Sequence, residues 1–234
     1  MSEGGGVDVR EHGAGQQVAD QRLFVKFQAF GGVADVKALA AALDRSGLEG
    51  ALYADLHDPR GVGVVVMSED PVHLATRVRD VLGAEPFAGL EPKPALALLG
   101  RTYASGFEPD LADWLLARPR RVICDPASAW AIWYPLRRSG AFARLTRDEQ
   151  AAILREHGAL GRAYGEAGLA NDIRLACHGL DPNDNDFVIG LIGPGLHPLS
   201  HLVQSMRRTV QTSQYLERLG PFFVGYALWR QAAR

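Results

Sequence analysis

The pattern of apolar and polar positions occurs twice along the chain in the same order. Short apolar runs rich in β-branched residues predict strands, and longer segments with helical periodicity predict helices. In the first half the expected strands are residues 22–30, 50–56, 61–68 and 94–102, and the expected helices are 33–47 and 70–83. In the second half the expected strands are residues 128–135, 172–180, 186–193 and 221–230, and the expected helices are 146–165 and 198–216.

Each half therefore reads strand, helix, strand, strand, helix, strand. This order predicts an α+β fold of two ferredoxin-like βαββαβ repeats, each an antiparallel sheet with two helices on one face. The stretch LHDPRGVGVVVMSEDPVHL in the first half echoes GLDPNDNDFVIGLIGPGLHPL in the second, which indicates a duplication. The two sheets are expected either to pack face to face or to close into a dimeric α+β barrel with the helices outside.

The same pattern divides the chain into domains. Residues 22–103 form the expected first repeat, residues 104–128 a linker, and residues 129–234 the second repeat. Residues 1–21 are polar and rich in glycine, so they are expected to be a disordered tail.

One residue on an otherwise apolar helix face is a candidate for chemistry. Thr146 and Glu149 form a capping box, which predicts that a helix begins directly after Thr146. The apolar face of that helix carries Ile153, His157, Leu160 and Tyr164. His157 is either a core histidine bonded to a backbone carbonyl or, because a single imidazole on an apolar cavity is how haem iron is held, an axial ligand. Spacing alone does not choose between the two.

Arginines of the second half are candidates for binding anions. Arg137 and Arg138 follow Tyr134 at a strand end, where they are either a solvated turn or a pair suited to carboxylates. Arg174 lies inside a strand, either at a sheet edge or lining a polar cavity. Asp172 is on the same face of that strand. We expect Asp172 to hold the Arg174 guanidinium, which would compete with a small anionic ligand.

Composition narrows the class of protein. Of the 234 residues, 47% are hydrophobic and the net charge is −2, with no basic block beyond short clusters such as RPRR, which argues against a dedicated nucleic-acid binder. Cys124 and Cys177 lack the spacing of a zinc site or a disulfide framework. Apolar runs are too short to span a membrane, and the N-terminus has no apolar signal core. We therefore expect a soluble, cytoplasmic protein without a nucleic-acid partner.

Four stretches of the second half, in this order, resemble the chlorite dismutase family of haem proteins, including its coproheme decarboxylase branch, which makes haem b from iron coproporphyrin. They are YPLRRSG, EHGALGR, GLDPNDNDF and YLERLGPFFVG. The first half is similar in architecture, since the family has two ferredoxin-like domains per chain with haem in the second. The resemblance implies haem b or coproheme as the porphyrin, hydrogen peroxide or chlorite as a reactant, and a homo-oligomer, commonly a pentamer.

The resemblance also implies roles for residues. His157 matches the proximal iron ligand, and Tyr134 matches the tyrosine that the decarboxylase branch oxidises to a radical. Arg138, together with Arg137, stands near the basic residue of the decarboxylase motif. Arg174 falls where the chlorite-degrading branch has a distal arginine, although 17 residues separate it from His157, more than is usual in the family. Gln211 is the nearest candidate for the place where the family has a glutamate bonded to the proximal histidine.

Three functions follow from these features. The leading hypothesis is peroxide-dependent oxidative decarboxylation of coproheme to haem b, with Tyr134 as the radical relay. The alternative enzyme is a chlorite dismutase, with Arg174 holding the oxychlorine anion. The third is a non-catalytic haem protein for storage, transfer or sensing, which the neutral Gln211 favours because an amide would leave the imidazole less electron-rich than a carboxylate does.

Overall fold

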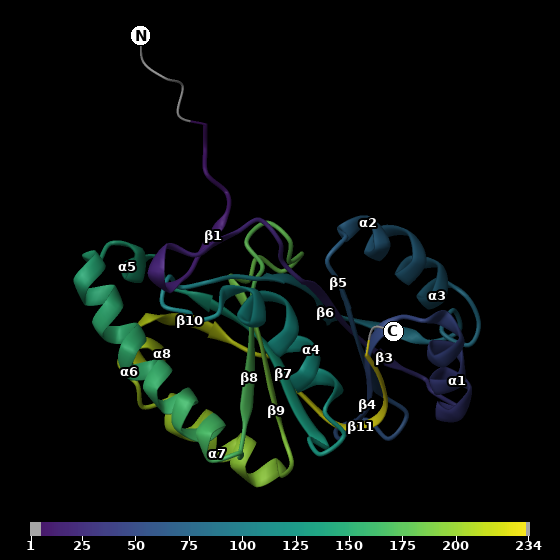
Figure 1. The fold of residues 1–234 in the computed structure, drawn as a ribbon. Helices are drawn as coiled ribbons and strands as arrows, with labels where there is room; N and C mark the ends of the chain where they lie inside the picture. The colour runs from purple at the N-terminus through teal and green to yellow at the C-terminus, as the bar shows by residue number, and fades with distance from the viewer. Residues whose placement is uncertain (1–5, 233–234) are drawn as a thin grey trace.

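The structure, a computed structural model, describes residues 6–232 (Figure 1). It confirms an α+β fold built from two repeats of the expected order. Within the described residues, no helix combines the length and the apolar character needed to cross a membrane.

The first repeat follows the predicted element order closely. Its strands are β3 (Phe24–Gly31), β4 (Glu49–Asp55), β5 (Val62–Ser68) and β6 (Glu91–Thr102). Its helices are α1 (Val36–Ser46) and a continuous helical segment of α2 (Pro71–His73), η2 (Leu74–Val78) and α3 (Arg79–Gly83). Helix α1 begins where the Asp35 side chain accepts hydrogen bonds from two backbone N–H groups, and it ends at Gly47, whose φ of 70° suits a residue without a Cβ.

The second repeat carries additional short elements. Its strands are β7 (Trp130–Arg138), β8 (Asn171–Ala176), β9 (Phe187–Gly193), β10 (Leu216–Leu219) and β11 (Phe223–Gln231). Its helices are α5 (Gly140–Ala143), α6 (Arg147–Glu166), α7 (Leu196–Met206) and α8 (Val210–Tyr215). The capping box of Thr146 and Glu149 is present at the start of α6. The helix expected over 198–216 is broken, because residues 207–209 separate α7 from α8.

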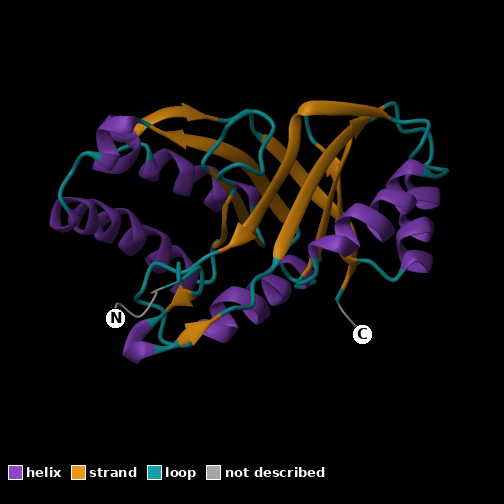
Figure 2. Ribbon diagram, turned by 90° about the horizontal axis from the view of Figure 1, so that it is seen from above, coloured by secondary structure: helices purple, strands orange, loops and turns teal. Residues whose placement is uncertain are grey.

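The two sheets close into one barrel. Strand order is β4-β5-β3-β6 in the first repeat and β11-β7-β9-β8 in the second, and this is the same ferredoxin-like order twice. The repeats join edge to edge where β11 pairs with β4 and where β6 pairs with β8. Strand β10 pairs with β7 at residues 136–138, beyond the part of β7 that pairs with β11. Figure 2 shows the strands in the middle with helices on opposite flanks, so the barrel alternative is the one the chain adopts.

Three apolar clusters hold this arrangement together. The barrel interior is filled by side chains of both repeats, with Phe27, Trp133 and Phe223 in aromatic contact. Gly190 makes room for the indole of Trp133, because a Cβ there would lie 2.6 Å from the ring. A second cluster packs α1 onto the first sheet, and a third packs α6 and α7 onto the second.

The segment expected to be a linker is helical. Residues 113–124 form η3 (Asp113–Ala117) and α4 (Arg118–Cys124). Helix α4 contacts β4, β11 and β8, and its fully buried Ile123 belongs to the barrel core. Because β4 and β8 lie in different repeats, α4 covers an end of the barrel. The expected disorder is likewise wrong for residues 11–19, which form β1 (Glu11–His12), η1 (Ala14–Gln16) and β2 (Val18–Ala19).

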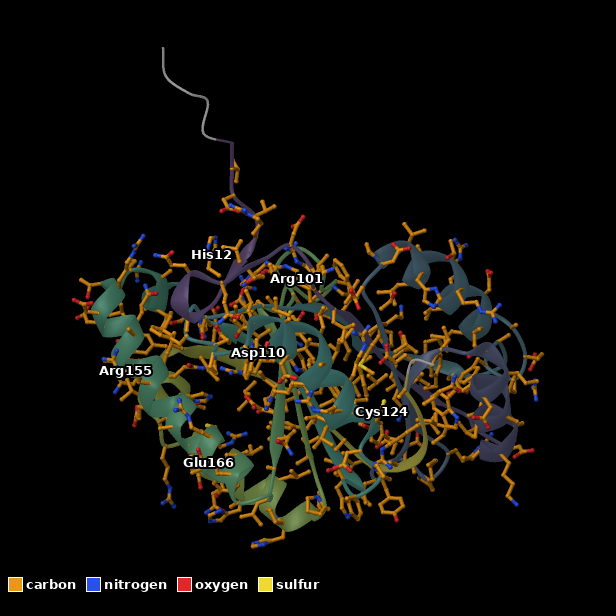
Figure 3. All side chains as sticks on the ribbon, viewed as in Figure 1. His12, Arg101, Asp110, Cys124, Arg155 and Glu166 are labelled. Atoms are coloured by element: carbon orange, nitrogen blue, oxygen red, sulfur yellow. The ribbon has the colours of Figure 1, made fainter. Side chains whose placement is uncertain are left out.

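The short N-terminal hairpin is held by the start of the linker segment. Glu11 pairs with Arg101 at 2.7 Å and accepts a hydrogen bond from the Ala104 backbone N–H. The Gln17 side chain donates to the Pro109 carbonyl and accepts from the Leu111 N–H. Figure 3 shows His12 of the hairpin and Arg101 of β6 in the same region of the molecule. These long-range contacts give the polar segment an ordered position that its composition does not predict.

Candidate functional site

The candidate residues of the second repeat meet between α6 and the outer surface of the barrel. Successive residues of a strand point to opposite faces of the sheet. Ile173 and Leu175 pack in the barrel core, as does Trp133, so Arg174 and Tyr134 point outward. Helix α6, together with α7 and α8, covers this outer surface (Figure 1).

Helix α6 covers the surface loosely. No residue of α6 is fully buried, whereas Leu39 and Leu43 are buried in α1, the corresponding helix of the first repeat. The polar side of α6 includes the exposed side chains of Arg155 and Glu166 (Figure 3). An apolar helix face that protein covers only in part leaves hydrophobic surface for a flat ligand.

His157 lies on the inner face of α6, where its ring is partly buried. Its Nδ1 is 3.1 Å from the Thr209 hydroxyl, in the break between α7 and α8. Burial, with the Arg174 and Arg138 guanidinium groups nearby, lowers the pKa of His157 to about 4. The imidazole is therefore neutral at physiological pH, which is the form that binds a metal ion.

This lowered pKa predicts a pH dependence of stability. Between the ordinary pKa of about 6.5 and the folded value, the unfolded chain binds a proton that the folded chain does not. The free energy of unfolding should therefore fall as the pH drops from 7 to 4, by about 2–3 kcal/mol from this group. Chemical denaturation of the ligand-free protein and of His157→Gln across this range measures the difference. Equal pH slopes in the two proteins would contradict the assignment.

Tyr134 points outward from β7 into the layer between the barrel and α6, where His157 also lies. Its side chain is 7% exposed, and its ring lies against Phe222 with a centroid separation of 4.7 Å. Burial raises the pKa of Tyr134, with Asp172 adding to the shift and Arg207 opposing it. The phenol therefore keeps its proton at physiological pH.

The structure separates the two adjacent arginines of β7. Arg137 is 44% exposed and pairs with Asp184 at 2.7 Å and Glu217 at 3.4 Å. Arg138 instead lies with its guanidinium 4.6 Å from the centroids of both the Phe142 and the Phe187 rings. The structure thus brings Arg138 to the layer and places Arg137 at the surface, which differs from the expectation that the two act as a pair.

The half-buried Arg138 guanidinium makes no ion pair within the described part of the chain. Its Nε is buried without a hydrogen-bond partner, although the nearby Asp186 carboxylate accepts from the Arg138 backbone N–H at 2.8 Å. Burial lowers the pKa of this guanidinium, with Tyr103 and Asp186 opposing the shift. A partly buried cation without an ion-pair partner favours an anionic group on a ligand.

Arg174, in contrast, is already paired. Its Nε lies 2.9 Å from Oδ2 of Asp172, so the two form the ion pair that the sequence led us to expect, although the contact lacks the geometry of a hydrogen bond. Arg118 of α4 holds the same carboxylate, with Nη2 3.0 Å from Oδ1, and donates to the Asp172 backbone carbonyl at 2.7 Å. Both guanidinium groups lie over the Trp114 ring, at 4.8 Å for Arg174 and 4.7 Å for Arg118. Burial alone would raise the pKa of Asp172, but the two arginines hold it below its ordinary value.

Sequence reasoning missed three members of this site. Trp114 and Arg118 lie in the segment taken for a linker, although Leu111, Leu115 and Ile123 already show a helical spacing of apolar residues there. Thr209, and not Gln211, lies at Nδ1 of His157. Gln211 is buried in α8, and its side-chain carbonyl oxygen has no hydrogen-bond partner among the described residues.

Comparison with known proteins places the chain in a family. The family model described as chlorite dismutase matches residues 98–228, more than half of the chain. The chain belongs to the chlorite dismutase family. The matched region runs from the end of β6 through β11, so it includes every candidate residue discussed above. No curated protein sequence matches the chain.

Solved structures of the chlorite dismutase fold superpose over most of the chain. A haem-binding protein from Thermus thermophilus is 19% identical, with a TM-score of 0.69 over 89% of this chain and 92% of that one. Chlorite dismutase from Candidatus Nitrospira defluvii in complex with imidazole is 15% identical, with a TM-score of 0.66 over 90% of this chain and 92% of that one. At these identities the likeness is one of fold.

Proposed function

We propose that this chain binds an iron porphyrin between α6 and the outer faces of β7, β8 and β9, and that it catalyses peroxide-dependent oxidative decarboxylation of coproheme to haem b. His157 would hold the iron through Nε2. The solved haem-binding protein with the same fold supports the porphyrin part of this proposal. When bound, the iron porphyrin supplies the oxidising chemistry with peroxide.

The residues present fit such a ligand. The inner face of α6 offers partly uncovered apolar surface and a neutral imidazole. The unpaired Arg138 guanidinium offers a partner for a propionate carboxylate. A propionate carboxylate at that position would give the Arg138 guanidinium an ion-pair partner.

The observation that carries the choice of reaction is the pairing of Arg174 with Asp172. A chlorite dismutase needs an arginine free to hold a small anion, whereas here Nε of Arg174 is in an ion pair with Asp172. Decarboxylation needs no free arginine at that position. It needs an oxidisable side chain near the propionates, and Tyr134 is a neutral phenol in the same layer as Arg138.

The reaction balances with one peroxide for each propionate. A propionic acid side chain loses its carboxyl group as carbon dioxide and one hydrogen from the carbon attached to the porphyrin ring, which leaves a vinyl group. The two electrons and two protons that are released reduce one hydrogen peroxide to two waters. The role of Tyr134 in this balance is to carry electrons from the propionate, and its raised pKa keeps the phenolic proton on Oη in the resting protein.

Product analysis tests the proposal. The purified protein is incubated with coproheme and titrated with hydrogen peroxide, and the porphyrins are separated by chromatography. We expect haem b to accumulate at two peroxides per porphyrin. Oxygen release from chlorite without haem b would instead identify a chlorite dismutase, and porphyrin binding with neither outcome would identify a non-catalytic haem protein.

The role of Asp172 gives a separate prediction. In Asp172→Asn the carboxylate that neutralises Arg174 is lost, so a small anion should bind the ferric coproheme complex more tightly. One charge-assisted hydrogen bond corresponds to an increase in fluoride or azide affinity of about 10-fold or more. Spectroscopic titration measures this affinity. Glu166→Gln, which removes an exposed carboxylate of α6, is the matched control, and equal affinities in both variants would contradict the role of Asp172.

A further inference from the structure

The Thr209 hydroxyl contacts both a backbone carbonyl and the ring of His157. Thr209 is 5% exposed and sits between α7 and α8. Its Oγ1 is 2.8 Å from the backbone carbonyl oxygen of Met206 and 3.1 Å from Nδ1 of His157. A threonine hydroxyl has one proton to donate and two lone pairs that accept.

The Met206 carbonyl fixes where that proton goes. A carbonyl oxygen only accepts hydrogen bonds, so the short contact to Met206 uses the hydroxyl proton. The other neighbour, the Thr212 hydroxyl at 3.3 Å, is farther away and has a proton of its own to donate. When that proton goes to Met206, the Thr209 hydroxyl accepts from His157, and Nδ1 of His157 then carries a hydrogen.

From this geometry we infer that Thr209 is a positioning residue that selects the Nδ1–H tautomer of His157 and so leaves the lone pair on Nε2. The inference deepens the proposed function and rests on it, because a free lone pair on Nε2 is what an iron ligand at this place requires. The break between α7 and α8 is the part of the chain that brings this hydroxyl to the His157 ring.

Thr209 also sets the character of the ligand. A hydroxyl is neutral, so it withdraws less of the Nδ1 proton than a carboxylate would, and the imidazole stays less electron-rich. The buried Gln211, two residues further along, does not replace this contact, because its carbonyl oxygen has no partner among the described residues. Among the residues described, Thr209 is the only side chain hydrogen-bonded to the His157 ring.

The decisive experiment uses the ligand-free protein, so its outcome does not depend on porphyrin binding. Long-range ¹H–¹⁵N correlation spectra of ¹⁵N-histidine-labelled protein near pH 7, assigned with His157→Gln, report which ring nitrogen carries the hydrogen. We expect a protonated Nδ1 and an unprotonated Nε2 in the wild type. Thr209→Val should give a mixture of tautomers, and Thr209→Ser, which keeps the hydroxyl, should restore the wild-type pattern.

Two results would overturn the inference. One is a wild-type His157 with its hydrogen on Nε2, and the other is a Thr209→Val variant with the wild-type tautomer. The first result is read from the wild-type spectrum alone, so it does not require any variant to fold. A second readout is coproheme affinity, which should fall about 10-fold or more in Thr209→Val and recover in Thr209→Ser, the scale for loss of a partner behind a metal ligand. If the tautomer is as expected but His157 does not bind the iron, the proposed function fails and the tautomer assignment stands.

Discussion

Tyr134→Phe is expected to bind coproheme as tightly as the wild type and to produce haem b at least about 100-fold more slowly, equivalent to about 2.7 kcal/mol or more in activation free energy. The ring lies against Phe222 with an interplanar angle of 33°, and phenylalanine keeps that ring, so the substitution should leave the fold and the binding unchanged. A phenol can give up an electron at a potential where a phenyl ring cannot. Titration with peroxide and chromatography of the porphyrins measure the effect.

Two other tyrosines serve as matched controls for this variant. Tyr103 lies against Phe187 at a centroid separation of 5.6 Å, and Tyr164 of α6 bonds to His201. Tyr103→Phe and Tyr164→Phe should retain haem b formation. Normal turnover by Tyr134→Phe, or loss of turnover in one of the controls instead, would assign the relay to a different residue.

His157→Ala should lose the axial ligand and with it the spectrum of a five-coordinate high-spin haem. Removing the partner behind a metal ligand already costs about 10–100-fold in affinity, so removing the ligand itself should cost coproheme affinity at least about 100-fold. The side chain is only partly buried, and its lowered pKa shows that burial disfavours the charged imidazole. The ligand-free variant should therefore fold. Absorption spectroscopy during coproheme titration measures both properties.

Added imidazole provides an internal check on His157→Ala. The truncated side chain leaves room for a free imidazole at the position of the ring, which should restore the wild-type spectrum. His178→Ala is the matched control, because His178 is 59% exposed and pairs with Asp186 at the surface. An unchanged spectrum in His157→Ala, or a lost spectrum in His178→Ala, would show that the iron ligand is not His157.

The fold could be predicted from the sequence where local patterns decide it. Period-two and period-3.6 apolar patterns identified the strands and main helices of both repeats, and the capping box of Thr146 and Glu149 fixed the start of α6. The edge-to-edge closure of the barrel depends on pairings between distant residues, such as Arg101 with Ala176, which no local pattern encodes. The order of residues 11–19 likewise depends on long-range contacts to residues 101–111.

The site could be predicted only in part, for a similar reason. Strand alternation correctly placed Arg174 opposite Ile173 and Leu175, and it predicted Asp172 as the partner of Arg174. Three long-range contacts could not be read from spacing: Arg118 on Asp172, Trp114 beneath both guanidinium groups, and Thr209 on His157. Apart from the contact of Trp114 with Arg118, each joins residues at least 52 positions apart in the sequence.

We propose that an iron porphyrin lies between α6 and the barrel with its iron on His157. Anomalous diffraction at the iron absorption edge, from crystals of the coproheme complex, locates the iron. We expect a single iron peak bonded to Nε2 of His157, with a propionate carboxylate at the guanidinium of Arg138. An iron peak in the barrel interior, or next to another histidine such as His178 or His201, would contradict it.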